Sequence, residues 1–213
     1  NSSGIVAQRI QQDGTLVDAL PFYVEQGFGS ADVAALGDVF LVTGLQVGYN
    51  PEDVHPIAAR VRGSDGVVLD LDGLLVGASY VRFVAVAVLN SRWLVVSQQH
   101  ATHDEGPAST VGAFVNADGS FDAPFGIYGI YSTSQYSYGP AIASNGSVAF
   151  VLQTAEISSG VEMDLVGRMV YADGSLGTAV TLTPWEGNQY RPQVAGDGND
   201  FIAVYQDQRN RFT

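Results

Sequence analysis

Apolar and polar residues alternate through the segment 192–209, which reads PQVAGDGNDFIAVYQDQR. Small residues fill its first part, and the second part is the apolar run Phe201-Ile-Ala-Val-Tyr205. A turn rich in Gly, Asn and Asp separates the two parts. Alternation on both sides of such a turn predicts a β-hairpin.

The same pattern recurs along the chain about every 53 residues. Each copy has a strand of small residues, a strand of large apolar residues, a third strand, an Asp-Gly turn and a fourth strand. No stretch has the 3.6-residue apolar period of a helix. The pattern therefore predicts an all-β chain with four short antiparallel strands per unit. The Asp-Gly turns are Asp13-Gly14, Asp65-Gly66, Asp118-Gly119 and Asp173-Gly174.

Four antiparallel strands per unit, without helices, are typical of a β-propeller blade. The chain opens with the third and fourth strands of a unit and closes with the first and second. We therefore expect one four-bladed β-propeller domain over 1–213, with velcro closure by the N- and C-terminal half-blades, because closure removes exposed sheet edges. The alternative is a section of a longer propeller. The expected blades are 31–78, 79–136, 137–189, and 190–213 together with 1–30.

Residue size along the strands indicates which strand lies nearest the propeller axis. The first strand of each unit has alanine or glycine where bulk would clash, as in Ala34-Ala35 and Ala195-Gly196. The second strand has the large apolar residues expected to fill the space between blades. The expected buried residues are Phe40, Val42, Trp93, Val95, Phe150, Phe201 and Val204.

The last half-unit, Pro192 to Arg209, and the first, Ile5 to Gly14, read P-x-V-A-x-x-G-x-x-F-x-x-V-Y-Q-D-x-R and then I-x-A-x-R-x-x-x-D-G. This pattern resembles the repeats of secreted bacterial β-propeller proteins, whose blades read V-W-x-D-x-R and then I-x-A-x-R-x-x-x-D-G. The middle units share only the skeleton, since Gln98-Gln-His100 and Gln153-Thr-Ala155 lack the Asp and the Arg. The resemblance implies the fold and an exported protein, but no single reaction.

Charge and composition narrow the function classes. The net charge is −13, and the nine basic residues are all arginines. Such a surface repels phosphate backbones, so we expect no nucleic-acid partner. No apolar run approaches the length of a membrane span, so we expect no membrane insertion. The chain has no cysteine, which excludes disulfides and thiol chemistry. An acidic, arginine-only surface fits an extracellular or cell-surface setting.

Propeller geometry gathers the long loops on one face, here called the long-loop face. These loops join the second strand to the third, and the fourth strand to the next blade. Aromatic rings spaced round such a face would stack on the apolar faces of sugars, while Asp207 and Arg209 would bind hydroxyl groups. The alternative is that the rings fill gaps between blades. The aromatic candidates are Phe28, Tyr80, Tyr136, Tyr138, Trp185 and Tyr190.

The three histidines of the chain fall in two neighbouring long loops. His100, His103 and Asp104 belong to one loop, and His55 to the other. Imidazoles and carboxylates that converge from adjacent loops would hold Zn²⁺, and an acidic cluster would hold Ca²⁺ through its oxygens. The alternative is a solvated polar loop without a metal.

Three functions remain open. The first is a non-catalytic binding module of an exported or cell-surface protein that engages a glycan or a protein partner through the long-loop face. The second is a structural or assembly subunit of a larger surface complex. The third is a glycoside-hydrolase-like enzyme with a metal or a carboxylate pair on that face. The carboxylate candidates by loop position are Asp53, Asp104, Glu156 and Asp207.

Arginines recur just before the Asp-Gly turns. Arg9, Arg60 and Arg168 occupy the third strands of three units, and Phe114 replaces the arginine in the fourth. We expect each arginine to form an ion pair with the adjacent turn aspartate.

Overall fold

The structure is a computed structural model that describes residues 4–47, 54–77, 80–101, 108–132, 139–158, 162–183 and 187–208. These residues form 16 strands, and every ladder between them is antiparallel. The prediction of an all-β chain is confirmed. Over the same ranges, no helix is long and apolar enough to cross a membrane.

Three complete four-stranded sheets, here called blades 1 to 3, follow one another along the chain. In each, the strands pair in sequence order. Blade 1 comprises β3 (Phe28–Leu36), β4 (Val39–Val47), β5 (Val54–Arg62) and β6 (Leu74–Leu75). Blade 2 comprises β7 (Val81–Leu89), β8 (Arg92–His100), β9 (Ala108–Val115) and β10 (Phe125–Ser132). Blade 3 comprises β11 (Ala141–Ser144), β12 (Val148–Ser158), β13 (Glu162–Tyr171) and β14 (Val180–Thr181).

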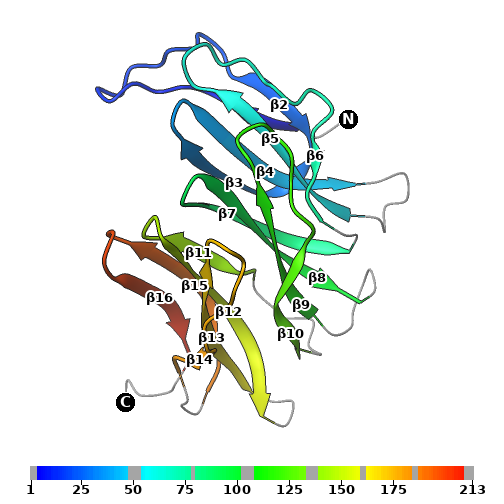
Figure 1. The fold of residues 1–213 in the computed structure, drawn as a ribbon, viewed down its shortest axis with the longest axis vertical. Coiled ribbons are helices and arrows are strands. Elements are labelled where there is room, and N and C mark those ends of the chain that lie inside the picture. The colour runs from blue at the N-terminus through cyan, green and yellow to red at the C-terminus, as the bar shows by residue number, and fades with distance from the viewer. Residues whose placement is uncertain are drawn as a thin grey trace.

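The two chain ends form separate two-stranded sheets. β1 (Gly4–Ala7) and β2 (Phe22–Gln26) make the N-terminal half-blade, and β15 (Gln189–Gly196) and β16 (Phe201–Asp207) make the C-terminal half-blade. The predicted velcro closure into a four-bladed ring is therefore not formed among the described residues. The two half-blades lie at opposite ends of an open array of blades (Figure 1).

The first strand of each unit lies on the inner side of the array, as predicted. β3 contacts β7, β7 contacts β11, and β11 contacts β15. The small residues of these strands allow the close approach. The array therefore has the arrangement of successive blades about an axis, although it does not close.

The Asp-Gly turns form as the sequence predicts. The four glycines have φ between +75° and +90°, a region that costs glycine little. Each turn aspartate accepts a hydrogen bond from the backbone N–H two residues later, at 2.9 to 3.0 Å. In two turns a serine hydroxyl also donates to the aspartate at 2.6 Å, from Ser120 and from Ser175.

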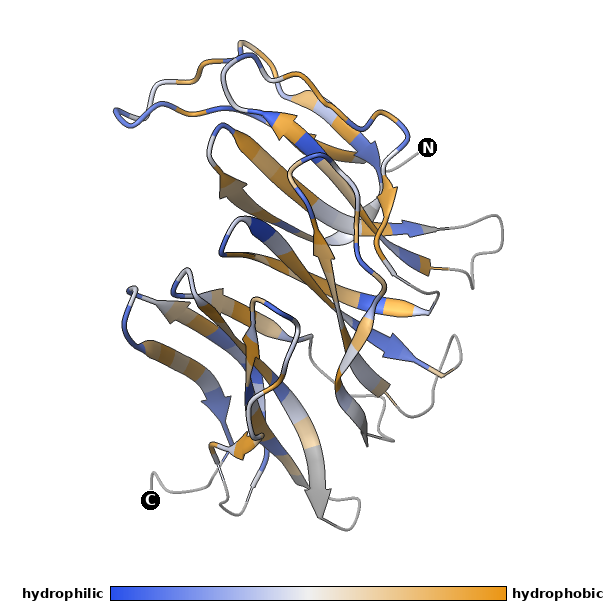
Figure 2. Ribbon diagram, viewed as in Figure 1, coloured by the Kyte–Doolittle hydropathy of each residue, from blue (hydrophilic) through white to orange (hydrophobic). Residues whose placement is uncertain are grey.

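The apolar core lies in the seams, which are the contacts between successive blades. Figure 2 shows that hydrophobic residues are concentrated in the strands of the blades. Trp93 is fully buried in the seam between blades 1 and 2, and its Nε1 donates to the carbonyl of Ala34 at 2.9 Å. Val95 and Phe150 are buried as predicted. Phe40 and Val204 are not, because they lie on the half-finished ends of the array, with exposed fractions of 38% and 58%.

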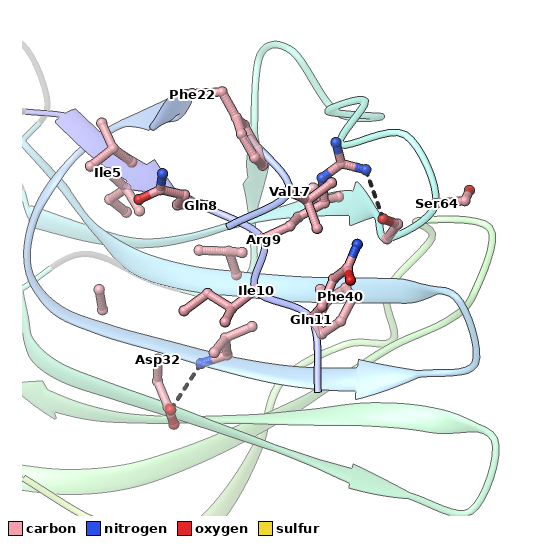
Figure 3. Close-up of a pocket in the computed structure, with 17 residues that line it drawn as sticks. Ile5, Gln8, Arg9, Ile10, Gln11, Val17, Phe22, Asp32, Phe40 and Ser64 are labelled. Atoms are coloured by element: carbon pink, nitrogen blue, oxygen red, sulfur yellow. Dashed lines mark hydrogen bonds between the residues drawn. The ribbon is translucent and has the colours of Figure 1, made fainter. Parts of the chain in front are cut away.

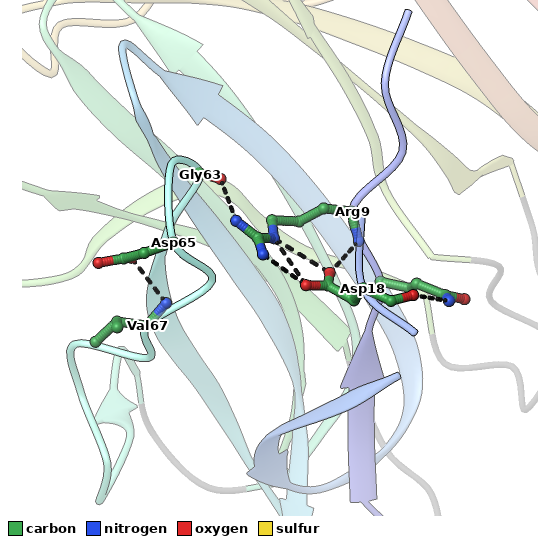
Figure 4. Close-up of polar contacts among 6 residues, drawn as sticks. Arg9, Asp18, Gly63, Asp65 and Val67 are labelled. Atoms are coloured by element: carbon green, nitrogen blue, oxygen red, sulfur yellow. Dashed lines mark hydrogen bonds and ion pairs between the residues drawn. The ribbon is translucent and has the colours of Figure 1, made fainter. Parts of the chain in front are cut away.

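Arginines of the third strands connect neighbouring blades. Arg9 pairs with Asp18 at 2.6 Å and donates to the carbonyl of Gly63 in blade 1 at 3.0 Å (Figure 4). Arg60 likewise pairs with Asp70 at 2.7 Å and donates to a carbonyl of blade 2 at 2.6 Å. The predicted partner, the turn aspartate, was wrong, because the fourth strand brings a later aspartate back beside the arginine.

Arg168 also departs from the prediction. Its guanidinium donates to the carbonyls of Gly177 at 2.8 Å and Ile127 at 2.6 Å rather than to a carboxylate. In the β-ladder it lies one residue before the position of Arg9 and Arg60. It therefore points to the preceding blade instead of the following one.

Candidate functional site

The inner strands are irregular near the long-loop face. The registers of β3, β7 and β15 shift near their first residues, as expected for β-bulges. Three non-glycine residues there have left-handed backbones: Ser30 at φ +43°, Tyr80 at +64° and Arg191 at +52°. Such conformations cost energy and concentrate at functional sites. The long-loop end of the inner strands is thus a candidate functional region.

Buried polar side chains also gather toward this face. In the seam between blades 2 and 3, the half nearest the Asp-Gly turns is apolar, but the half nearest the long loops is polar. We call the polar residues the seam cluster, and each is at most 9% exposed. Burial of polar groups is costly without hydrogen bonds, so a concentration of them needs a reason. The members are Gln98, His100, Thr110, Gln153 and Asp164.

Strand registers place His100 and Asp164 at the same height on facing blades. The hydroxyl of Thr110, which lies opposite Gln98, donates to Oε1 of Gln153 across the seam. In β8, His100 lies two residues after Gln98. In blade 3, Asp164 lies opposite Ala155, which comes two residues after Gln153 in β12. Side chains two apart on a strand share a face. The seam therefore brings an imidazole and a carboxyl together at its long-loop end.

Hydrogen bonds between blades 2 and 3 hold the seam together next to the seam cluster. The hydroxyl of Tyr128 lies 3.1 Å from the carbonyl of Val151 and 3.3 Å from that of Val166, both in blade 3. Arg168 reaches back to blade 2, as described above. These bonds fix the two blades relative to each other. The seam cluster is therefore preorganised by its surroundings.

Gln153 has an unused donor in this cluster. Its Oε1 accepts from Thr110, but its Nε2 has no hydrogen-bond partner among the described residues. A buried amide hydrogen without a partner costs about 1 to 3 kcal/mol. A hydroxyl-bearing ligand or a water molecule at this position would satisfy it.

A second polar group lies between blade 3 and the C-terminal half-blade. Asn188 connects them, because its Oδ1 accepts from Met163 N at 2.9 Å and its carbonyl accepts from Gln208 N at 3.0 Å. Asp207 pairs with the fully buried Gln189 in the β15–β16 ladder. Asp164 and Asp207 thus lie next to residues that share Asn188 as a partner.

Only part of the predicted aromatic ring falls within the described residues. Tyr80 is 38% exposed and precedes β7, and Tyr190 is half-buried in β15. Phe28 begins β3. The remaining candidates, Tyr136, Tyr138, Trp185 and Arg209, lie outside the described residues. The predicted sugar-stacking role of these rings stays a prediction.

The predicted metal ligands are similarly divided. His55 lies in β5 of blade 1, and His100 ends β8 of blade 2. His103 and Asp104 lie outside the described residues. Within the ranges that the structure describes, no three His, Asp or Glu side chains are grouped to hold a metal ion. The Zn²⁺ or Ca²⁺ site stays a prediction, and the strand registers place His100 at the height of Asp164.

The seam cluster was missed by the sequence analysis. His100 and Asp164 are far apart in the chain, and they meet only because blades 2 and 3 pack together. The available signal was the polar pair Gln98 and Gln153 in second strands that are otherwise apolar. We had interpreted these glutamines only as departures from the repeat.

A separate pocket of about 750 Å³ opens beside β1. It is lined mainly by apolar side chains of β1, the segment after it, β3 and β4 (Figure 3). Phe40, Val42 and Ile10 are among them, and Asp32 and Arg9 lie at its edge. Asp32 is the one carboxylate in the lining of this pocket, which lies on the side of blade 1 that faces the N-terminal half-blade.

Successive four-stranded antiparallel blades about an inner row of strands define a β-propeller-like protein. No family model matches the chain, and no curated protein matches it. Two solved structures are similar in fold. An α-L-arabinofuranosidase from Lactobacillus brevis is 10% identical, with a TM-score of 0.53 over 88% of this chain and 71% of that one.

An apocarotenoid oxygenase mutant from Synechocystis is 12% identical, with a TM-score of 0.56 over 97% of this chain. The match spans about half of the oxygenase, 51% of its length. Both neighbours are β-propeller-like enzymes. The prediction of a non-catalytic binding module is contradicted, since both neighbours are enzymes, and at 10% and 12% identity the likeness itself concerns the fold.

Proposed function

We propose that this chain is the propeller part of a glycoside-hydrolase-like enzyme whose reaction takes place at the long-loop end of the seam between blades 2 and 3. The observation that carries the proposal is that the strand registers place two buried side chains, His100 and Asp164, at one height of this seam. The fold likeness to an arabinofuranosidase supports it and suggests furanosides as the first substrates to test.

The seam cluster has the groups that glycosidic cleavage requires. A proton donor must protonate the leaving oxygen, and a second group must activate water or attack the sugar. In the proposal, the imidazolium of His100 donates its proton to the leaving oxygen, and the carboxylate of Asp164 takes a proton from the attacking water. Gln98 and Gln153 bind sugar hydroxyls.

The test is hydrolysis of a panel of 4-nitrophenyl glycosides, beginning with the α-L-arabinofuranoside. Asp164→Asn and His100→Gln should each lower kcat/KM by about 10²- to 10⁴-fold, the usual size of an acid–base contribution. Asp200→Asn is the matched control, because Asp200 is exposed on the opposite, turn-bearing face. It should leave the rate unchanged.

The variants must also be compared by thermal melting, since loss of a buried polar side chain can lower stability. A wild-type protein without activity on the whole panel rejects the proposal. So does full activity in folded Asp164→Asn protein. A bell-shaped pH profile that loses one limb in His100→Gln protein would assign that limb to the imidazole.

The expected setting follows from the same proposal. We propose that the enzyme acts outside the cell, on polymeric or surface glycans. Support comes from the acidic surface with arginine as its sole basic residue, and from the resemblance to exported propeller repeats. Export of the native gene product into the culture medium would be the direct check.

A further inference from the structure

Glu25 is a buried carboxylate without a counter-charge. It lies in β2, in the seam between the N-terminal half-blade and blade 1, and is 6% exposed. Its Oε1 accepts from the backbone N–H of Gln26 at 2.7 Å, but its Oε2 has no hydrogen-bond partner among the described residues. Within the same residues it belongs to no ion pair. Buried charges in proteins are paired or coordinate metal ions, because burial removes their hydration.

Blade 1 closes over this carboxylate. Ile57 of β5 is 1% exposed, and Gly73, in the turn before β6, has φ +65°. A Cβ added to Gly73 would meet Oε2 of Glu25 at 2.8 Å and Cδ1 of Ile57 at 2.5 Å. Oε2 therefore lies beside the backbone of Gly73 and the side chain of Ile57, neither of which carries a positive charge.

β2 and β10, the fourth strands of the N-terminal half-blade and blade 2, contain the same β-bulge. Each has one extra residue at the same register, Val24 in β2 and Ile127 in β10, and both are buried. The residues that follow are Glu25 and Tyr128. Each lies opposite a third-strand residue five places before the bridge across the Asp-Gly turn. Glu25 and Tyr128 therefore occupy equivalent positions of the repeat.

Tyr128 shows what this position faces in the next blade. Its hydroxyl lies 3.1 Å from the carbonyl oxygen of Val151 and 3.3 Å from that of Val166. In blade 1 the equivalent residues are Val42 and Ile57, counted from the valine that bridges across each Asp-Gly turn and from the residue opposite it. β2 also contacts β5 across its seam. The repeat therefore directs the carboxylate of Glu25 toward two carbonyl oxygens.

A carboxylate cannot make the contacts that Tyr128 makes. The tyrosine hydroxyl donates a hydrogen to a carbonyl, whereas an ionised carboxylate only accepts hydrogen bonds. A cation between these oxygens satisfies all of them and also balances the buried charge. Carboxylate and backbone carbonyl oxygens are the ligands of Ca²⁺, at about 2.3 to 2.6 Å. A glutamate side chain is shorter than a tyrosine side chain, which leaves space between the oxygens for an ion.

We propose that Glu25 holds a Ca²⁺ ion in the seam between the N-terminal half-blade and blade 1. The carbonyl oxygens of Val42 and Ile57 are further ligands, and water completes the coordination shell. Mg²⁺ is a poorer occupant, because it requires near-ideal octahedral geometry and dehydrates reluctantly. This site has one carboxylate and no imidazole, so it differs from the metal site predicted in the histidine loops.

The ion has a structural role in this proposal. It joins the N-terminal half-blade to blade 1, as the hydroxyl of Tyr128 joins blade 2 to blade 3. A single carboxylate supplies little ligand charge, so the expected dissociation constant is that of extracellular modules, about 10⁻⁴ to 10⁻³ M. The seam should therefore be more stable in a medium that contains millimolar calcium.

Thermal melting of the wild-type chain, first treated with a chelator and then dialysed, tests the proposal. For a dissociation constant of about 1 mM, CaCl₂ at about 10 mM should raise the melting temperature by about 3 to 6 °C. MgCl₂ at the same concentration is the control for ionic strength and for divalent charge. It should raise the melting temperature far less.

Two variants of Glu25 identify the ligand. Glu25→Gln removes the charge but keeps the shape, and it should abolish the calcium-dependent shift. Glu25→Tyr places in the half-blade the residue that blade 2 uses, so it should no longer respond to calcium. Asp200→Asn is the matched control, because it removes the same charge from an exposed side chain. It should keep the full shift.

Calorimetric titration of Ca²⁺ into the wild-type chain provides a measurement that needs no variant. It should show a site with a dissociation constant in the range given above. The proposal is overturned if the wild type binds no Ca²⁺, or if MgCl₂ and CaCl₂ raise its melting temperature equally. It is also overturned if folded Glu25→Gln or Glu25→Tyr protein keeps the whole shift, since the ion would then bind elsewhere. None of these readouts depends on glycosidase activity, so this proposal and the proposed reaction can fail separately.

Discussion

Arg60 joins two blades through one guanidinium group. It makes a two-pronged pair with Asp70, at 2.7 and 2.8 Å, and its third nitrogen donates to the carbonyl of Ala117 in blade 2. Both charged side chains are at most 13% exposed. Arg60→Met should lower the free energy of unfolding by about 1 to 3 kcal/mol, the usual value for hydrogen bonds to charged groups.

Arg62 offers an internal comparison for this prediction. It pairs with Asp65 at 3.0 Å, but both side chains are 44% exposed. Arg62→Met should therefore cost less than about 0.5 kcal/mol. Urea unfolding of both variants measures the difference. Equal losses would mean that the contact with blade 2 adds nothing.

The turn aspartates make stability depend on acid pH. The pKa of Asp173 is lowered from 3.8, chiefly by the hydroxyl of Ser175 and then by its backbone N–H. The pKa of Asp118 is lowered in the same way by Ser120. A lowered pKa in the folded state means that the unfolded chain binds the proton more tightly. The stabilisation is complete above about pH 4 and is lost as the pH falls below it.

Ser175→Ala tests this dependence. The variant should be less stable than the wild type at pH 7, and the gap should narrow as the pH is lowered from 4 toward 2.5. The urea midpoints of the wild type and the variant at a series of pH values measure this difference in stability. A gap that stays constant with pH would show that the hydroxyl does not act through the ionised carboxylate of Asp173.

At the residue scale, the sequence predicted what depends on neighbours along the chain. The Asp-Gly turns are local structures, because aspartate and glycine supply both the hydrogen bond and the positive φ. The arginine partners were predicted wrongly, and the placement of His100 and Asp164 at one height of the seam was not predicted at all. Both depend on which strands lie side by side in space, and residue type alone does not specify that.

Among the elements, β8 and β4 show how burial differs at one repeat position. Trp93 in β8 and Phe40 in β4 both lie opposite the valine beside the Asp-Gly turn. Trp93 is fully buried and hydrogen-bonded to Ala34, whereas Phe40 is 38% exposed. Trp93→Ala should cost about 3 to 5 kcal/mol, as truncation of a large core residue does.

Phe40→Ala should cost only about 1 kcal/mol in the monomer, since much of the ring is already in water. Chemical denaturation at low protein concentration measures both variants. Equal costs of the two variants would contradict the difference in burial.

Strand existence and order were accessible from the sequence because both follow from a repeated local pattern. The alternation of apolar residues set the strand faces, and the small residues of β3, β7, β11 and β15 marked the inner strands. The burial of Phe40 and Val204 was overestimated for one reason. Both predictions assumed that a complete blade packs against the residue. Phe40 instead faces the N-terminal half-blade, and Val204 lies in the C-terminal half-blade.

Across the whole molecule, stability should fall toward the two ends. Two-stranded sheets are marginal by themselves, whereas β8 and β9 lie within a complete blade that is flanked on both sides. In hydrogen exchange at concentrations where the chain is monomeric, amides of β1 and β16 should exchange at least about tenfold faster than those of β8 and β9. Uniform protection along the chain would contradict this.

Ring closure is the feature of the whole molecule that the sequence predicted least well. Closure depends on the rotation between successive blades, and this rotation arises from the sum of many side-chain contacts in each seam. The repeat length and the complementary half-units are the same for a closed four-bladed ring and for a section of a longer propeller. The separation of β1 and β16 in space is what argues against the closed ring.

The indole of Trp93 has an optical consequence. The chain has two tryptophans, and Trp185→Phe would leave a single emitter, seated in a dry environment between blades 1 and 2. Its emission would shift to longer wavelength only when those two blades part and water reaches the ring. One fluorescence trace would then time the opening of a single junction while circular dichroism follows the remaining sheets.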